Sequence, residues 1–236
     1  MDIINCDKER NCENEEADKV YIACFDIGKK NFAFVVEEID LSQLKSVKNI
    51  AYKDRYLKNG TPSSQFLSIL RKVCKAGKIV LMENIDITYG TDCSLYLDPK
   101  IFINMNEVLD KRLKYWDKCS AFIVEQQMSF GKNKRNTMAL KLGQHCYSYF
   151  TFHYADFKQT LEFPAYHKTK VLGAVKKLSK PERKKWAIEK AIEILTLRED
   201  DDNLSNLETR KKRDDISDCI LMCVSFSYLA YIEKKL

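Results

Sequence analysis

The sequence contains few of the residues that interrupt regular secondary structure, with seven glycines and four prolines among 236 residues. This scarcity excludes a collagen-like chain and a chain dominated by linkers or low-complexity segments. The only three histidines are scattered, at His145, His153 and His167, and no Cys-x-x-Cys pair occurs among the nine cysteines. The ligand spacing of a structural zinc site is therefore absent, and we expect no zinc.

Long apolar runs are also lacking. No uninterrupted apolar run reaches the roughly 18–20 residues of a membrane-spanning helix. Residues 1–18 are charged where a signal peptide would be apolar. We therefore expect an intracellular protein with no membrane partner, in which cysteines remain reduced and those in apolar segments pack as small hydrophobic side chains.

Charge is modest in total and uneven in distribution. Lysine and arginine exceed aspartate and glutamate by 40 to 34, a net charge of +6. Residues 131–141 and 176–185 concentrate cations, whereas residues 7–18 and 199–202 are acidic. Clustered cations suit a polyanionic partner, although a lysine-rich segment is also the usual composition of a solvated face.

The pattern of apolar residues predicts strands that alternate with helices. Strands are expected at residues 20–26, 31–39, 78–87, 121–125 and in the pieces 154–157 and 162–165; helices are expected at 62–76, 99–117, 134–150, 181–197 and 212–234. We interpret residues 199–208 as a polar loop and residues 1–18 as disordered. This order predicts an α/β fold, a mixed sheet with helices on both faces, in a single domain over residues 19–236.

Carboxylates stand at the ends of several apolar elements. In "YIACFDIG", Asp26 follows an apolar strand directly, and burial of an unpaired charge is costly, so Asp26 either caps a turn or is held there for chemistry. Glu125 closes "AFIVE" in the same way, with a water-facing strand end as its alternative. Asp214, Asp215 and Asp218 open the last predicted helix, where acids commonly complement the helix dipole.

Taken together, these acids predict a metal site. Asp215 and Asp218 are three residues apart and share one helix face. Acids that end two strands can meet such a helix at one edge of the sheet, and their mutual repulsion then requires a cation. Oxygen ligands suit Mg²⁺ or Mn²⁺, and two such ions per site assist phosphodiester hydrolysis. We predict that Asp26, Glu125 and the acids at the start of the last helix (Asp214, Asp215 and Asp218) form the site for these ions.

Glu83 is the alternative to Glu125, because it too follows a short apolar run, in "IVLMENID". Further strand-like residues follow Glu83, however, whereas Gln-Gln and the basic segment follow Glu125. A strand that ends at Glu125 places its carboxylate at the edge of the sheet, and we therefore favour Glu125 over Glu83 as the metal ligand.

Three segments carry a resemblance to a known family. "FDIGKKNFAF", "FIVEQQ" and "KKRDDISDC" are similar, in order and character, to motifs of the poxvirus- and iridovirus-type Holliday junction resolvases, relatives of the RuvC resolvases in the RNase H-like superfamily. The resemblance extends from about residue 20 to residue 232 and includes "LGQHCYSYF" and "EFPAYHKTKVLGA". Residues 55–76 are longer than the compact poxvirus pattern, so strand pairing there is not implied.

The resemblance implies an RNase H-like five-stranded sheet and a homodimer that resolves four-way DNA junctions with a divalent metal, leaving 5′-phosphate ends. It implies catalytic carboxylates at Asp26 and Glu125 and at a D-x-x-D pattern that fits Asp215 and Asp218, with Asp214 as a neighbour that could also reach a metal. It also implies a catalytic lysine, for which the sequence offers Lys184 or Lys185, and we favour Lys184. In our hypothesis Asp26 bridges the two ions. We expect phosphate contacts from the neighbouring cations Lys132, Lys134, Arg135, Lys141 and Lys185.

Other functions remain open at this point. A noncatalytic basic DNA-binding protein would use the same cations, with acids that are only structural, and a related nuclease would act on flaps or forks. Actin-like sugar kinases and ATPases also place Asp-x-Gly after the first strand. They need a second glycine-rich phosphate loop, which the sequence does not supply, and we expect no nucleotide cofactor.

Overall fold

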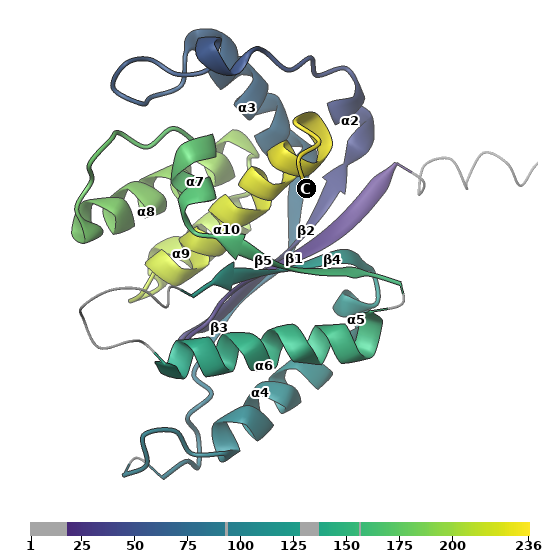
Figure 1. Ribbon diagram of the computed structural model, residues 1–236, viewed down its shortest axis with the longest axis vertical. Helices are drawn as coiled ribbons and strands as arrows, with labels where there is room; N and C mark the ends of the chain where they lie inside the picture. Colours follow the sequence, from purple (N-terminus) through teal and green to yellow (C-terminus); the bar gives the residue numbers. More distant parts are fainter. Residues whose placement is uncertain (1–17, 93, 128–136, 156) are drawn as a thin grey trace, which may run out of the picture.

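The computed structural model describes residues 18–92, 94–127, 137–155 and 157–236, and one mixed sheet forms its centre (Figure 1). The five strands have the order β3-β2-β1-β4-β5. Their bounds are β1 Lys19–Asp26, β2 Phe32–Asp40, β3 Gly77–Ile85, β4 Cys119–Gln126 and β5 Gln159–Pro164. The predicted fold class, a five-stranded α/β sheet with helices on both faces, is confirmed.

Strand β1 lies in the middle of the sheet. It pairs antiparallel with β2, which pairs antiparallel with β3, and parallel with β4, which pairs parallel with β5. The side chains of Ile22, Ala23, Cys24 and Phe25 are fully buried. This continuous apolar run is typical of a strand covered by helices on both faces.

Helices fill the connections and the two faces. Their bounds are α2 Leu41–Lys45, α3 Ser64–Ala76, α4 Lys100–Asp110, α5 Leu113–Trp116, α6 Thr137–Tyr154, α7 Tyr166–Val171, α8 Lys180–Leu197, α9 Asp201–Thr209 and α10 Asp214–Ser227, with a 3₁₀ turn η1 at Tyr52–Asp54 and a π-helical turn η2 at Tyr228–Ile232. Ser179 begins α8 with a capping box, in which its side chain and that of Glu182 bond each other's backbone N–H groups.

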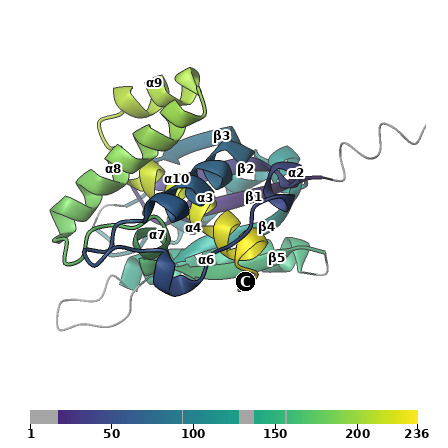
Figure 2. The ribbon, with the colours of Figure 1, turned by 90° about the horizontal axis from the view of Figure 1, so that it is seen from above.

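The sheet separates two hydrophobic cores. Because successive side chains of a strand point to opposite faces, Ile22 and Cys24 join the core under α3, α8 and α10, whereas Ala23 and Phe25 join the core under α4, α5 and α6. Figure 2 shows α10 lying over the sheet with α3 and α8 beside it. The site described below lies at one end of this sandwich.

Helix α10 is the most apolar helix of the described chain. Together with η2 it spans Asp214–Ile232, 19 residues with a mean hydropathy of 1.4, which passes a length and composition test for a membrane span. Yet 72% of this segment is buried inside the fold. It contacts the sheet directly, and the Cys219 thiol lies 3.5 Å from the Ala33 carbonyl oxygen. We therefore interpret it as a core helix that covers the sheet.

Three of the predicted elements are wrong. The helix expected over 99–117 breaks between α4 and α5, where the Leu109 carbonyl accepts a hydrogen bond of 2.7 Å from the Trp116 indole. The acidic loop at 199–208 is helix α9, because the Asp200 carboxylate caps it and acids in its first turn complement the helix dipole. In place of the strand expected at 154–157, α6 continues to Tyr154 and packs that ring 5.1 Å from Phe122, and neither Ala155 nor Phe157 belongs to a strand, whereas Asp156 lies outside the described residues.

The predicted disorder of residues 1–18 falls almost wholly outside the described residues. Asp18, the first residue described, is held in place, because its carbonyl oxygen accepts a 2.7 Å hydrogen bond from Leu41 N–H. Its carboxylate also pairs with Lys45 at 2.5 Å. Asp18 itself is therefore fixed to α2.

A buried ion pair joins α8 to the sheet. The Arg198 guanidinium donates two hydrogen bonds of 3.0 Å to the Glu37 carboxylate and one of 2.7 Å to the Cys74 carbonyl. The two side chains are 4% and 1% exposed. Removing one partner of such a pair leaves the other charged and desolvated in the core.

We predict that Glu37→Ala lowers the free energy of unfolding by about 3–5 kcal/mol. The matched control is Glu189→Ala, which breaks the exposed pair of Lys185 and Glu189 on α8 and should cost less than about 1 kcal/mol. Urea unfolding of both variants measures the difference, and similar losses in the two would contradict the assignment.

Candidate active site

Two parallel strands bring the first two acids together. In the pairing of β1 with β4, Phe25 lies opposite Val124, so the next residues along the chains are Asp26 and Glu125. Parallel strands end at the same edge of a sheet, and both carboxylates therefore stand at that edge. The tertiary structure thus explains why an acid follows each of these apolar runs.

The third acid comes from α10. This helix buries Ile216 and Ile220 against the sheet, and the same packing directs Asp218 toward the ends of β1 and β4. One carboxylate oxygen each from Asp26, Glu125 and Asp218 lies within 4.8 Å of the others. Residues separated by almost two hundred positions in the sequence therefore meet in one acidic cluster, which we define as Asp26, Glu125 and Asp218.

Burial and repulsion act on the protonation of this cluster. Burial raises the pKa of Asp26 well above its ordinary value of 3.8, and the neighbouring charges of Glu125 and Asp218 raise it further. Burial likewise raises the pKa of Asp218, in spite of an opposing contribution from Lys168. Without a cation in addition to Lys168, the ionised cluster is electrostatically unfavourable.

Lys168 is the cation that the structure places in the cluster and that the sequence reasoning missed. Its ammonium lies 2.8 Å from both Glu125 Oε1 and Asp218 Oδ1, and its side chain is 5% exposed. Burial lowers the pKa of Lys168, but the charges of Glu125 and Asp218 outweigh burial and raise it. The ammonium therefore stays charged and links a strand to a helix.

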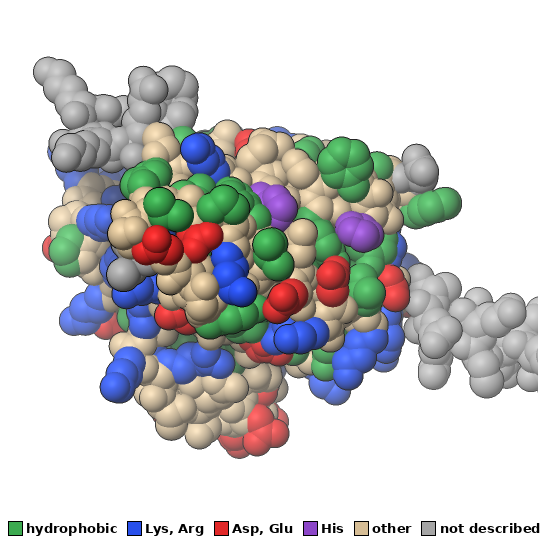
Figure 3. All heavy atoms as spheres, turned by 90° about the horizontal axis from the view of Figure 1, so that it is seen from below, with side chains coloured by type: hydrophobic (Ala, Val, Ile, Leu, Met, Phe, Trp, Pro, Cys, Tyr) green, Lys and Arg blue, Asp and Glu red, His purple; other side chains and the backbone are tan. Residues whose placement is uncertain are grey.

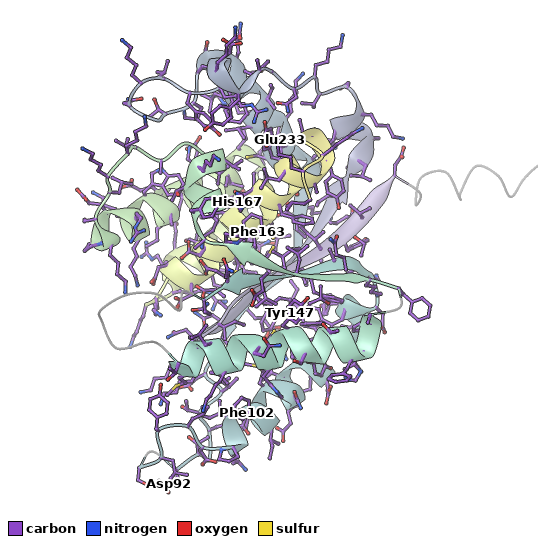
Figure 4. All side chains as sticks on the ribbon, viewed as in Figure 1. Asp92, Phe102, Tyr147, Phe163, His167 and Glu233 are labelled. Atoms are coloured by element: carbon purple, nitrogen blue, oxygen red, sulfur yellow. The ribbon has the colours of Figure 1, made fainter. Side chains whose placement is uncertain are left out.

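Helix α7, which carries Lys168, is held against β5 by a contact between neighbouring residues. Helix α7 begins soon after β5, and Figure 4 shows Phe163 and His167 beside each other, with ring centroids 5.2 Å apart. Phe163 in turn lies opposite Glu125 in the sheet. The segment "EFPAYHKTKVLGA" resembles the family, but α7 is too short for periodicity to mark Lys168, so the resemblance was the only available signal.

Asp214 and Asp215 have lysine partners outside the cluster. The Lys184 ammonium donates to the Asp214 carboxylate, and this bond outweighs burial and lowers the pKa of Asp214. Lys212 lies 2.5 Å from the Asp215 carboxylate, yet burial keeps the pKa of Asp215 raised. Lys184 thus contacts Asp214, whereas Lys168 contacts the cluster; the catalytic role of Lys184 stays a prediction.

Five further cations were predicted to contact phosphates. Lys132, Lys134 and Arg135 lie outside the described residues. Lys141 on α6 and Lys185 on α8 are exposed to solvent. Their phosphate contacts stay predictions.

Glu83 lies apart from the acidic cluster. Glu83 lies on strand β3, and its carboxylate accepts a 3.0 Å hydrogen bond from Nε of Arg112, the residue before α5. It therefore has a structural partner, and the structure places Glu125, rather than Glu83, beside Asp26 and Asp218.

The donor set of the cluster fits a hard divalent cation. All three donors are carboxylate oxygens, the ligands that Mg²⁺ and Mn²⁺ prefer. Three carboxylates against the single ammonium of Lys168 leave up to two negative charges uncompensated. Burial is the largest cause of the raised pKa of Asp26, and the charges of Glu125 and Asp218 raise that pKa further, in spite of Lys168. The cluster is therefore a candidate metal centre.

The fold is similar to that of a solved RuvC structure. The structure of Thermus thermophilus RuvC aligns with a TM-score of 0.51 and 12% identity, covering 89% of this chain and 95% of that one. The crystal structure of the yeast mitochondrial Holliday junction resolvase Ydc2 aligns with a TM-score of 0.49 and 12% identity, covering 91% of this chain and 80% of that one. Identity at this level establishes the fold alone.

The chain belongs to a family of iridescent virus proteins. Uncharacterized protein 170L of Invertebrate iridescent virus 6 is 31% identical, over 97% of this chain and 100% of that protein. Uncharacterized protein 97L of Invertebrate iridescent virus 3 is 30% identical, over 87% of this chain and 98% of that protein. No family model matches the chain. The expected viral context is thereby confirmed at the level of the family.

We predict that Asp26→Asn stabilises the metal-free protein, on the order of 1 kcal/mol at pH 8. An acid with a pKa raised in the folded state binds its proton more tightly there, so ionisation lowers native stability as the pH rises above 3.8. The advantage of the variant over the wild type should therefore grow from pH 5 to pH 8. Urea unfolding with a chelator measures it.

The control for this experiment is Asp202→Asn, which removes one exposed carboxylate from the first turn of α9. We expect this control to change stability by less than about 0.5 kcal/mol at either pH. An Asp26→Asn protein that is less stable than the wild type in chelator would contradict the repulsion inferred for the cluster.

We also predict that Lys168→Met destabilises the metal-free protein by about 3–5 kcal/mol, because it leaves buried carboxylates without a counter-charge. Lys184→Met is the matched control, since the Lys184 side chain is 47% exposed and its loss should cost no more than about 1 kcal/mol. Thermal unfolding of both variants makes the comparison. Equal losses would show that Lys168 does not hold the cluster together.

Proposed function

We propose that this protein is a divalent-metal-dependent endonuclease that resolves four-way DNA junctions. The observation that carries the proposal is the convergence of Asp26, Glu125 and Asp218, from two parallel strands and a helix, within 4.8 Å. The RuvC-type fold and the resemblance of the three acidic segments support the same function. The fold supports it only as a class, since one fold hosts many activities.

Mg²⁺, or Mn²⁺ in its place, would be held by Asp26, Glu125 and Asp218. Asp215 lies close enough to raise the pKa of Asp26 by its charge, and completes the proposed ligand set. Bound divalent ions lower the pKa of a coordinated water and stabilise the charge that develops on a phosphate. Two ions per site, bridged by Asp26, remain part of this proposal.

The side chains of this protein prepare the site for such chemistry. Lys168 fixes the orientation of Glu125 and Asp218 through two contacts of 2.8 Å, so that both oxygens stay directed into the cluster. Burial of the cluster restricts bulk water and strengthens its electrostatic interactions. Lys168 acts as a positioning residue here, and Lys184, beside Asp214, remains our candidate for contact with the scissile phosphate.

The alternative functions differ from the proposed one in chemistry or in substrate. Activity on flaps or forks would use the same cluster and is an alternative substrate, whereas a noncatalytic DNA-binding protein gains nothing from a cluster whose ionisation opposes folding. We propose a homodimer that acts on the two opposed strands of branched DNA, at an intracellular site. Each of these points comes from the resemblance or from the sequence.

We predict that Asp26→Asn lowers Mg²⁺-dependent nicking of a synthetic four-way junction by roughly 10²-fold or more. Binding of the intact junction should stay within about threefold, because the carboxylate contacts the ion rather than the DNA backbone. Single-turnover nicking and fluorescence anisotropy measure the two quantities. Cleavage by the variant at the wild-type rate would overturn the proposal.

Glu83→Gln is the matched control, because it neutralises an acid that pairs with Arg112 outside the cluster. It should retain nicking within about threefold, in the range of a change away from the reacting atoms. Parallel reactions on flap and fork substrates identify the preferred DNA structure. Tight binding without any metal-dependent cut would instead favour the noncatalytic reading.

A further inference from the structure

A basic groove lies between the segment around η1 and the loop that joins α7 to α8. Its volume is about 530 Å³. Cations and tyrosines line it, without an acid among the lining residues. We define this Tyr52 groove by Tyr52, Lys53, Lys170, Lys176, Lys177 and Arg183. The sequence reasoning assigned no function to these residues.

Backbone contacts hold the walls of the Tyr52 groove in place. Lys176 N–H donates a 3.2 Å hydrogen bond to the Asn59 carbonyl, and the Tyr56 hydroxyl donates one of 3.3 Å to the Val171 carbonyl. Gly60 has a φ of +95°, and a Cβ there would lie only 3.2 Å from Lys176 Cγ. The two segments therefore approach closely at a glycine, and the hollow beside them is built into the fold.

The Tyr52 groove is connected to the acidic cluster through two helices. On α7, Lys168 contacts the cluster and Lys170 lines the groove, about 3 Å further along the helix axis. On α8, Arg183 lines the groove and the next residue, Lys184, bonds Asp214. Figure 1 shows α7 between the start of α10 and this loop region. The groove and the acids thus share two of the helices that position them.

The positive charge of the Tyr52 groove favours a negatively charged partner. Its five cations are exposed, and within the described part of the chain none of them forms an ion pair. The Tyr52 ring is 58% exposed, and the Lys170 ammonium lies 5.6 Å from its centroid. Cations interleaved with aromatic rings suit a nucleic acid strand, through its phosphates and its bases.

On the opposite side of the molecule the surface side chains are of mixed type. The surface seen from below, where α4 and α6 lie, presents acidic, basic and hydrophobic side chains next to one another (Figure 3). Phe152 on α6 is 90% exposed, and Phe157, which follows the end of α6, is 87% exposed. A polyanion is therefore better accommodated at the Tyr52 groove than on this mixed face.

We propose that the Tyr52 groove binds the backbone phosphates of the DNA strand that adjoins the scissile bond. This inference rests on the proposed nuclease function, and it assigns the position of the substrate strand relative to the acids. The volume of about 530 Å³ is that of a pocket for a small ligand and fits a segment of one strand rather than a whole duplex.

The test compares two double variants that remove the same charge. Lys53→Gln with Lys176→Gln neutralises two groove cations, and Lys72→Gln with Lys75→Gln neutralises two exposed lysines of α3. In chelator, where no cleavage occurs, the groove variant should bind a synthetic four-way junction roughly tenfold more weakly at 0.1 M salt. Its log–log salt slope should fall by about 1.4–1.8, whereas the α3 variant should stay near the wild type.

A second measurement locates the phosphates. Neutral methylphosphonate linkages are placed one at a time near the cleavage position of the junction strand. A linkage that weakens binding of the wild type should have little further effect on the groove variant, because the charge pair is already lost. Additive losses at every position would show that the groove does not contact these phosphates.

The outcomes separate the two proposals. Equal losses of binding by the two double variants would overturn the groove and leave the nuclease proposal to its own cleavage test. A wild type that binds the junction through the groove but never cuts it would overturn the nuclease proposal alone. A wild type without affinity for junction DNA would overturn the groove directly.

Discussion

The mutual repulsion of three buried carboxylates, held together by one lysine, is the interaction on which the rest of this structure depends. Asp26, Glu125 and Asp218 would separate if each stood on a mobile loop. They stay within 4.8 Å because two strands and a core helix carry them and because Lys168 bonds two of them. Part of the stability that the two hydrophobic cores provide therefore offsets the electrostatic repulsion within the cluster.

This arrangement links stability to chemistry. A site whose negative charge is not fully neutralised by protein side chains binds a divalent cation more strongly than a site that is already neutral. Lys168 neutralises part of the charge and so keeps the metal-free protein folded, yet it leaves the cluster negative. The neighbouring acids Asp214 and Asp215 have their own lysine partners, Lys184 and Lys212, and add negative charge beside the cluster.

Helices α7 and α8 each carry one residue at the acidic site and another in the Tyr52 groove. Helix α7 places Lys168 in the cluster and Lys170 in the Tyr52 groove, and α8 places Lys184 at Asp214 and Arg183 in the same groove. Both the positioning of the acids and the proposed positioning of DNA therefore depend on how these two helices pack against β5 and α10. A change in that packing would act on both.

The sequence by itself determined the alternation of strands and helices, because apolar periodicity and capping residues are local properties. It also marked Asp26, Glu125 and Asp218, since an acid directly after or within an apolar element is conspicuous without coordinates. It did not determine that α9 is a helix, that α4 ends before α5, or that Lys168 enters the cluster. The first two follow from local bonds that apolar periodicity does not register, the Asp200 cap of α9 and the bond of the Trp116 indole to the Leu109 carbonyl. The entry of Lys168 depends instead on contacts with Glu125 and Asp218, which are distant in the sequence. The partner of a buried lysine is chosen by packing, and only the tertiary structure decides it.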